Sequence, residues 1–238
     1  VMNRDLRAAA EVCGALEDIP YDDRVRMAAE AARIFAEDEL PIGVTASDDE
    51  MGSLMTTFSE ASQSCVDMRA RTKVAGPEEF CRLQSRTLGL TVEMCRKSMT
   101  ACAACLTDVD RILKTQWDLL GTGMSLEDFY AGNVPGFERQ ADVVGISSPS
   151  NAPAHSRLWM VLPVAGTPVV QLPGETDVLT GMRFAFAMEK AGYPKGFFGS
   201  YRGDHGFKGP ACGSFHRLMA FGSGDTMDKL AKDKVRVE

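Results

Sequence analysis

Apolar residues recur at helical intervals in the segment that follows Pro20 and Tyr21. They make one face of a helix, consisting of Val25, Ala28, Ala32 and Phe35 and broadened by Met27 and Ile34. We therefore predict a helix over residues 20–40. Residues 41–53, PIGVTASDDEMGS, are polar and contain glycine, so we predict a loop that leads into another helix, with Asp48 or Asp49 as its cap.

The strongest periodic signal lies between residues 88 and 113. Its apolar positions alternate by steps of four and three: Leu88, Val92, Cys95, Met99, Cys102, Leu106, Val109 and Leu113. This spacing puts them on one stripe and predicts a single helix of roughly 30 residues. Gly121 and Gly123 are expected to end it.

The pattern changes after about residue 140. Four short apolar runs, at 143–147, 168–172, 196–201 and 217–223, alternate with helical stretches. Such runs are typical of parallel strands that are buried on both faces. The fold class that we predict is α/β, an open parallel Rossmann-like sheet preceded by a largely helical segment. We place the division in the sequence GNVPGFERQ, with a helical segment at 1–135 and the α/β domain at 136–238.

Composition and charge exclude several classes of protein. The 238 residues are 45% hydrophobic and 25% charged, as in an ordinary globular protein. A net charge of −7 argues against nucleic-acid binding, because phosphates need clustered Lys and Arg. No apolar run is long enough to span a bilayer, and the first residues do not resemble a signal peptide, so we expect a cytoplasmic protein.

The seven cysteines are scattered through helical patterns, which fits free thiols in a reducing compartment. Cys102 and Cys105, with Cys95 nearby, allow a metal or redox interpretation. A zinc site would need a second Cys or His pair at suitable spacing, and the three histidines lie in the other predicted domain. Because Cys95 and Cys102 lie on the apolar stripe, we interpret them as core and predict no metal site.

Candidate chemistry follows the ends of three predicted strands, where ligands bind in open parallel sheets. After the first strand comes Ser147–Pro153, with the sequence SSPSNAP, in which two prolines stiffen a turn that carries Asn151. An amide there can stabilise an oxyanion as it forms on a carbonyl carbon. The alternative is that Asn151 only satisfies its own turn.

Glu175 and Gly222–Ser223 follow two further strands. A carboxylate such as that of Glu175 can accept the hydroxyls of a ribose and repel a 2′-phosphate, which favours NAD over NADP, although it can equally stabilise the first turn of the next helix. Gly222 would let the backbone approach a pyrophosphate, to which Ser223 can donate. The absence of G-x-G-x-x-G argues against an ordinary Rossmann dehydrogenase.

These segments, in this order, resemble the aldehyde dehydrogenase superfamily. The matching motifs are a strand ending in S-P-x-N, a helix with Trp159, a strand ending in x-P-x-E, a helix ending in A-G-x-P-x-G and a final F-x-G-S region. The resemblance covers residues 141–238 well and extends more loosely to the helix at 20–40, where P-x-x-x-R precedes an Ala-rich helix.

The resemblance implies a role for each matching residue. Asn151 would stabilise the oxyanion, and Glu238, preceded by the strand-like KVRV, would be the catalytic glutamate. Cofactor contacts are implied for Ile146, Ser148, Pro149, Glu175, Gly222 and Ser223, the first three of which would line the approach of the nicotinamide. The implied cofactor is NAD or NADP, and the implied partners are an aldehyde or acyl substrate and either a second copy or a catalytic-domain segment.

The chain also departs from the family pattern. Leu172 replaces the usual lysine of the second-strand motif, and Met227 stands where a second glycine is expected. The nucleophilic cysteine is missing: Cys212, in GPACG, precedes Gly222 and so has the wrong order, and we interpret it as a small buried residue.

The sequence therefore favours part of an NAD(P)-dependent oxidoreductase that oxidises an aldehyde through an enzyme thioester, with the cysteine outside this chain. One alternative is an acyl-CoA reductase that runs in the reductive direction. Another is a degenerate, non-catalytic nucleotide-binding or scaffold module, so whether the chain acts as an enzyme stays open.

Overall fold

A computed structural model of the chain describes residues 2–44, 72–119, 123, 125, 128, 142–149, 151–174, 176–177, 179–201, 209, 211–222, 224–225 and 228. Its first half is mainly helical. The elements there are α1 (Met2–Glu17), α2 (Tyr21–Glu37), β1 (Leu40–Val44), β2 (Thr72–Ala75), α5 (Pro77–Leu88), α6 (Val92–Thr107) and α7 (Val109–Leu119). Within the described ranges, no helix combines the length and the apolar character that crossing a membrane requires.

The second half forms a four-stranded parallel sheet. Its elements are β3 (Val144–Ser147), the 3-10 helix η1 (Pro153–Leu158), β4 (Val169–Leu172), α9 (Leu179–Lys190), β5 (Phe198–Ser200) and β6 (Arg217–Ala220). The strand order is β5-β4-β3-β6, and all neighbouring pairs are parallel. The chain therefore moves outward from β3 through β4 to β5 and then returns to the other side of β3. The predicted open α/β sheet is confirmed.

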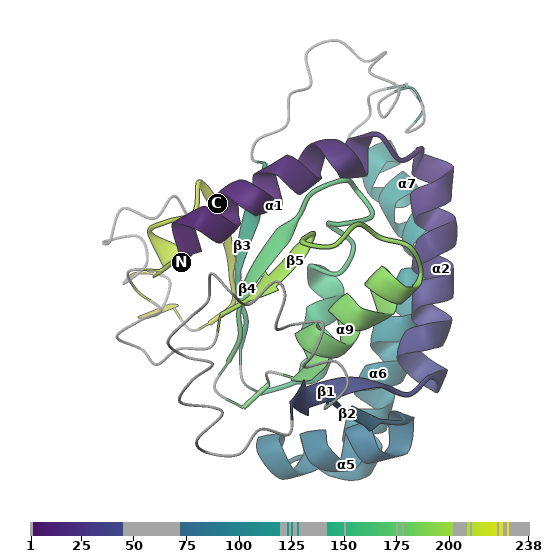
Figure 1. Cartoon of the computed structure of the whole chain (residues 1–238), viewed down its shortest axis with the longest axis vertical. Helices are drawn as coiled ribbons and strands as arrows, with labels where there is room; N and C mark the ends of the chain where they lie inside the picture. The colour runs from purple at the N-terminus through teal and green to yellow at the C-terminus, as the bar shows by residue number, and fades with distance from the viewer. Residues whose placement is uncertain are drawn as a thin grey trace.

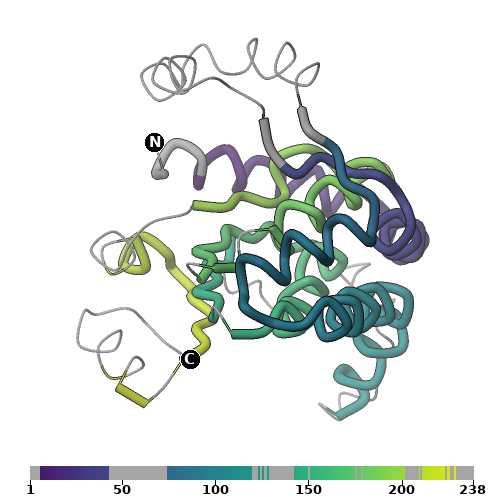
Figure 2. The backbone as a smooth tube through the Cα atoms, turned by 90° about the horizontal axis from the view of Figure 1, so that it is seen from below, coloured from purple at the N-terminus to yellow at the C-terminus, as the bar shows by residue number. Residues whose placement is uncertain are grey.

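Successive side chains of each strand point to opposite faces of the sheet, and an apolar cluster covers each face. Val144, Ile146 and Val169 face the larger core, which they share with α2, α6 and α9 (Figure 1). Val170, Leu172 and Leu218 face a smaller cluster with Ala211, Cys212 and Phe215. Since the larger core contains residues from both predicted domains, the helical segment and the sheet share one apolar interior; the tube in Figure 2 follows the chain through both.

The predicted helix over residues 88–113 is wrong in length. Gly89, with φ of 69°, ends α5, and the Thr91 side chain then caps α6 by accepting a hydrogen bond from the Met94 N–H (3.2 Å). A second break lies at Asp108, between α6 and α7, where the backbone has φ of −91° and ψ of 10°. The apolar stripe itself is confirmed, since Cys95, Met99, Cys102, Leu106 and Val109 are buried.

Two other expectations are corrected. Residues 41–44, predicted as loop, form part of β1, which pairs antiparallel with β2. That pairing depends on a partner about 30 residues away, so no local pattern indicates it. The helix expected around Trp159 is a short 3-10 helix followed by turns, and Trp159 itself is buried with its ring stacked on Phe198 (centroids 5.6 Å apart). Asp48 and Asp49 lie outside the described residues.

Candidate cofactor site

The carboxyl ends of β4, β3 and β6 meet at one edge of the sheet. The Ser148 N–H donates to the Leu172 carbonyl (3.1 Å), and the Phe221 N–H donates to the Ser147 carbonyl (3.1 Å). From β3 the strand order proceeds to β4 and β5 on one side, whereas β6 lies on the other side of β3, so β3 and β6 form a topological switch point. Outside such a switch point the two connections diverge, and ligands of open α/β sheets bind in the crevice between them.

The structure brings several of the predicted residues to this edge. Ser148 and Pro149 are half-buried beside the end of β3, Asn151 is exposed just beyond them, and Gly222 is exposed after β6. Ile146 is fully buried in the larger core, so its side chain packs under the site and does not line an open surface. Glu175, Ser223 and Glu238 lie outside the described residues.

Gln171 contributes to this edge and was not predicted from the sequence. Its side chain is 1% exposed, and its Nε2 donates to the Ser148 Oγ (3.0 Å), which orients the start of the SPSN turn. Helix α9 comes close here because it presents Gly181, where an added Cβ would lie 2.1 Å from the Gln171 Oε1. The available sequence signal was one amide among the apolar residues of PVVQL.

His155 holds the other end of the turn. Its Nδ1 lies 2.9 Å from the Ala152 carbonyl, which requires the hydrogen on Nδ1. The imidazole is half-buried and lies 6.4 Å from the Phe221 ring, so it bridges the turn and the end of β6.

Leu172 stands where the family pattern has a lysine, and its position in the structure differs from that of a surface cation. Its side chain is fully buried in the smaller cluster with Phe215 and Cys212, on the sheet face away from α9. An apolar side chain held inside offers no cation to an adenosine ribose. Gly222 is exposed at the switch point, whereas the side chain at position 172 is turned into the core.

The three cysteines that we predicted to be buried are core residues. Cys212 is 1% exposed, and Cys95 and Cys102 are fully buried. Burial raises the pKa of the Cys102 thiol to about 12, so it stays protonated near neutral pH and is a poor nucleophile. Cys105 is partly exposed and contacts the Arg157 carbonyl (3.3 Å).

Asp177 is a buried carboxyl close to the start of α9. It is 4% exposed, and it accepts a hydrogen bond from the Thr180 Oγ1 (2.6 Å), which in turn accepts one from the Gln84 Nε2 (2.6 Å). Burial raises the pKa of Asp177 above its ordinary value, and the hydrogen bonds from Thr180 and Gln84 only partly offset that rise. The ionised form is therefore disfavoured in the folded protein.

This carboxyl predicts a pH dependence of stability. Between the ordinary pKa of 3.8 and the higher folded value, the folded protein holds a proton that the unfolded chain has lost. Stability contributed by Asp177 is thus full below that window and falls as the pH rises through it, by at most about 1.4 kcal/mol per pH unit. The free energies of unfolding of the parent protein and of Asp177→Asn, measured with a chemical denaturant from pH 3.5 to 7, test this prediction. As the pH rises, the parent protein should lose stability relative to the variant. A difference independent of pH would contradict it.

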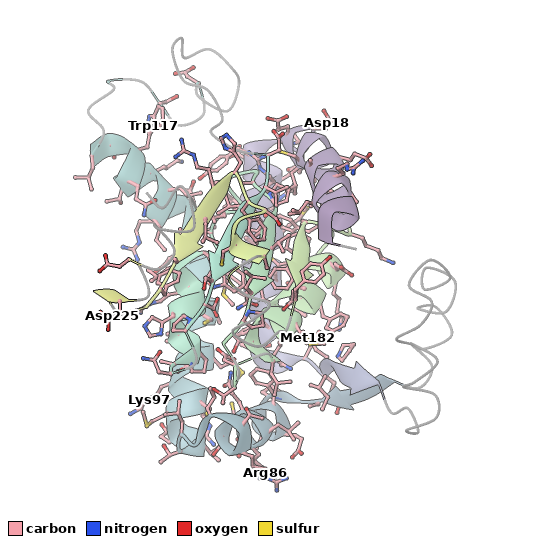
Figure 3. The ribbon with its side chains drawn as sticks, turned by 90° about the vertical axis from the view of Figure 1, so that its left-hand side faces the viewer. Asp18, Arg86, Lys97, Trp117, Met182 and Asp225 are labelled. Carbon is pink, nitrogen blue, oxygen red and sulfur yellow. The ribbon has the colours of Figure 1, made fainter. Side chains whose placement is uncertain are left out.

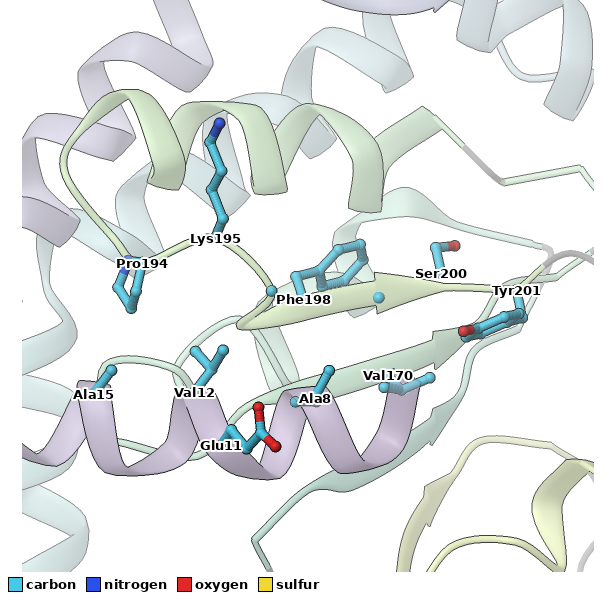
Figure 4. Close-up of a pocket in the computed structure, with 13 residues that line it drawn as sticks. Ala8, Glu11, Val12, Ala15, Val170, Pro194, Lys195, Phe198, Ser200 and Tyr201 are labelled. Carbon is cyan, nitrogen blue, oxygen red and sulfur yellow. The ribbon is translucent and has the colours of Figure 1, made fainter. Parts of the chain in front are cut away.

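A separate groove of about 720 Å³ lies between α1 and β5 (Figure 4). Its walls include Val12 and Ala15 of α1 and Gly196 and Gly199 near β5. It lies at the far edge of the sheet from β6, and none of the predicted cofactor residues lines it.

Comparison with solved structures identifies the fold. A benzaldehyde dehydrogenase from Corynebacterium glutamicum, described as NAD-dependent, superposes with a TM-score of 0.63 at 15% identity, covering 99% of this chain and 44% of that one. A succinate-semialdehyde dehydrogenase from Burkholderia pseudomallei gives 0.63 at 14% identity (99% and 42%). PnpE in complex with nicotinamide adenine dinucleotide gives 0.63 at 16% identity (98% and 41%).

The chain spans less than half the length of these proteins. No family model matches its sequence. At identities this low the likeness is one of fold, and it includes the helical segment as well as the sheet. The chain has the fold of the part of these proteins on which it superposes.

Proposed function

We propose that this chain is the cofactor-binding part of an NAD(P)-dependent aldehyde dehydrogenase-like oxidoreductase. The observation that carries the proposal is the switch point between β3 and β6, where the SPSN turn and Gly222 follow adjacent strands. Similar solved structures include enzymes described as NAD-dependent, which supports a pyridine nucleotide as the ligand. Within this proposal, a preference for NAD over NADP would come from the carboxylate of Glu175, which would repel a 2′-phosphate.

The proposed roles follow from position. Ser148 and Pro149 would flank the nicotinamide, with Ile146 packed beneath them, while Gly222 and Ser223 would meet the pyrophosphate just after β6. Asn151 is exposed on this turn, next to Ala152, whose carbonyl His155 bonds, and three residues after Ser148, which Gln171 bonds; we propose that its amide faces the substrate. An amide placed in this way can stabilise an oxyanion.

The bound nucleotide would accept the hydride, and the thiol that forms the thioester would come from outside this chain. Glu238 would then act as the general base, which requires a neighbour whose proton it removes. Association with a catalytic-domain segment or a second copy, and a cytoplasmic location, belong to the same proposal. So does the alternative of reduction of an acyl-CoA by the same site.

Calorimetric titration of the chain with NAD⁺, NADH, NADP⁺ and NADPH tests the proposal. We expect at least one of the four to bind with a submillimolar Kd, and Gly222→Leu to raise that Kd at least tenfold by filling the pyrophosphate approach. Gly209→Leu is the matched control, because among the described residues nothing lies within 4 Å of the position that its Cβ would occupy. No binding of any of the four nucleotides at millimolar concentration would contradict the proposal.

One observation favours a non-catalytic scaffold as the second candidate. Leu172 is locked into the smaller cluster by Phe215 and Cys212, so the cation that would hold an adenosine ribose is replaced by structural packing. A scaffold predicts that the folded chain binds no nucleotide, and the same titration therefore decides between the two functions.

A further inference from the structure

Strand β4 carries one polar side chain, and it is buried. Gln171 is 1% exposed and stands between Val170 and Leu172, which are buried apolar residues. Among the described residues, its Nε2 donates to the Ser148 Oγ (3.0 Å), whereas its Oε1 has no hydrogen-bond partner. A buried acceptor without a donor lowers the free energy of unfolding, and an apolar side chain of similar shape avoids that loss. Packing alone therefore favours an apolar residue at position 171.

Helix α9 confines this amide. A Cβ added at Gly181 would lie 2.1 Å from the Gln171 Oε1 and 2.8 Å from the Phe198 Cζ, so the helix backbone lies directly against the amide. Figure 3 labels Met182, the next residue of α9, and shows this helix beside the strands. The amide therefore has little room to turn away from β3, and its Nε2 stays within reach of Ser148.

The hydrogen bond fixes the direction of the Ser148 hydroxyl. An amide nitrogen only donates, so the Ser148 oxygen accepts and its own hydrogen points away from Gln171. The Ser148 N–H donates to the Leu172 carbonyl (3.1 Å), which holds the backbone of this residue as well. Ser148 is half-buried, and none of the described residues accepts a hydrogen bond from its hydroxyl. The end of β3 therefore presents a held donor that has no acceptor within the described part of the chain.

We propose that Gln171 is a positioning residue, which presents the Ser148 hydroxyl to the carboxamide oxygen of a bound nicotinamide. This inference rests on the proposed function, because it takes the ligand of the switch point to be a pyridine nucleotide. The carboxamide oxygen is a neutral acceptor at the edge of a flat ring, which suits a single half-buried donor beside Pro149. Residues that lower stability without another structural benefit are expected at functional sites, and the unpaired Oε1 of Gln171 marks one of them.

Calorimetric titration with NAD⁺ and with ADP-ribose tests the inference, because ADP-ribose keeps the pyrophosphate and the adenosine but lacks the nicotinamide. We expect Gln171→Met to raise the Kd of NAD⁺ about fivefold, which is the effect of one neutral hydrogen bond. The Kd of ADP-ribose should stay within about twofold of that of the parent protein, since its contacts lie elsewhere. NADP⁺ and 2′-phospho-ADP-ribose form the equivalent pair for a chain that prefers the phosphorylated cofactor.

A double-mutant cycle shows whether Gln171 acts through Ser148. Ser148→Ala removes the donor and should also raise the Kd of NAD⁺ about fivefold. Adding Gln171→Met to Ser148→Ala should then change this Kd by less than about twofold, because no hydroxyl is left to position.

Gln84→Met is the matched control. Gln84 is also 1% exposed with an unpartnered Oε1, but its Nε2 donates to Thr180, which bonds the buried Asp177. Gln84→Met removes a donor from a fully buried network, so it should lower Tm by about 3 °C or more and leave the ratio of the two Kd values unchanged. Gln171→Met should leave Tm equal or raise it, because the unpaired oxygen is removed and water can reach the half-buried Ser148.

The outcomes separate this inference from the proposed function. If the parent protein binds neither NAD⁺ nor NADP⁺, the proposed function fails and this inference fails with it. If the parent binds either nucleotide, the inference alone is overturned when Gln171→Met leaves that Kd unchanged or weakens the matching ADP-ribose equally. It is also overturned when Gln171→Met lowers Tm as Gln84→Met does, or adds its full effect to that of Ser148→Ala.

Discussion

Replacing Arg183 by Met is expected to lower the free energy of unfolding by about 3–5 kcal/mol, because three buried carbonyls lose their donor at about 1 kcal/mol or more each. Arg183 is 1% exposed, and its guanidinium donates to the carbonyls of Phe35 (2.8 Å), Asp38 (2.8 Å) and Ala75 (3.2 Å). Two of these acceptors belong to the C-terminal end of α2, where carbonyls lack helical partners and a cation is favourable. Met preserves much of the volume but leaves all three acceptors unpaired.

The guanidinium also lies 4.9 Å from the centre of the Phe80 ring, so Met loses a cation–π contact. Burial lowers the pKa of Arg183 to about 10, which still leaves it charged at neutral pH. Urea unfolding followed by circular dichroism measures the loss. Arg82→Met is the control, since Arg82 is exposed and forms surface ion pairs with Glu78 and Glu79, and it should change stability by no more than about 0.5 kcal/mol. A loss below 1 kcal/mol for Arg183→Met would contradict the structural role.

Arg183 also bears on how the two halves are connected. It lies on α9, inside the segment predicted as the α/β domain, yet it binds α2 and the strand β2. The two predicted domains are thus held together by a buried charge as well as by a shared core. The division near residue 135 stays a prediction; the contacts imply that both segments unfold together.

The sequence predicted the sheet well because each strand carries its own signal. Each of the four strands lies inside one of the predicted apolar runs, and β4 (Val169–Leu172) is buried along its whole length. Such a local pattern needs no knowledge of distant residues. The Asn151 turn and Gly222 could be placed for the same reason, since they directly follow strands whose parallel order brings their ends together.

What sequence reasoning missed depends on partners far away along the chain. The acceptors of Arg183 are 108 to 148 residues away, so an arginine in the helix GMRFAF looks like any surface residue. The hydrogen bond from Gln171 to Ser148 joins two strands, and β1 exists only because β2 pairs with it. The break at Asp108 was hidden by the unbroken apolar stripe, because hydrophobic spacing reports which face is buried and not whether the helix is continuous.

Gly145→Ala is expected to destabilise the protein by about 2–3 kcal/mol through overpacking at the base of the candidate site. A Cβ at Gly145 would lie 2.4 Å from the Phe215 Cγ and within 2.8 Å of two further ring carbons. Neither side can yield easily, since β3 is hydrogen-bonded to β4 and β6 on its two edges and Phe215 is 7% exposed in the smaller cluster. Thermal unfolding of the single variant measures the effect.

A double-mutant cycle separates this contact from a general loss of strand stability. Phe215→Leu alone should cost about 1–3 kcal/mol because it removes ring contacts on the face of β3 and β4. In that background Gly145→Ala has space for its methyl group, so the two losses should combine to at least 1 kcal/mol less than their sum. Additive losses would show that the alanine acts elsewhere. Strand β3 leads to Ser148 and Asn151 at the switch point. It therefore requires glycine at position 145 because the Phe215 ring occupies the space of a side chain, independently of any ligand.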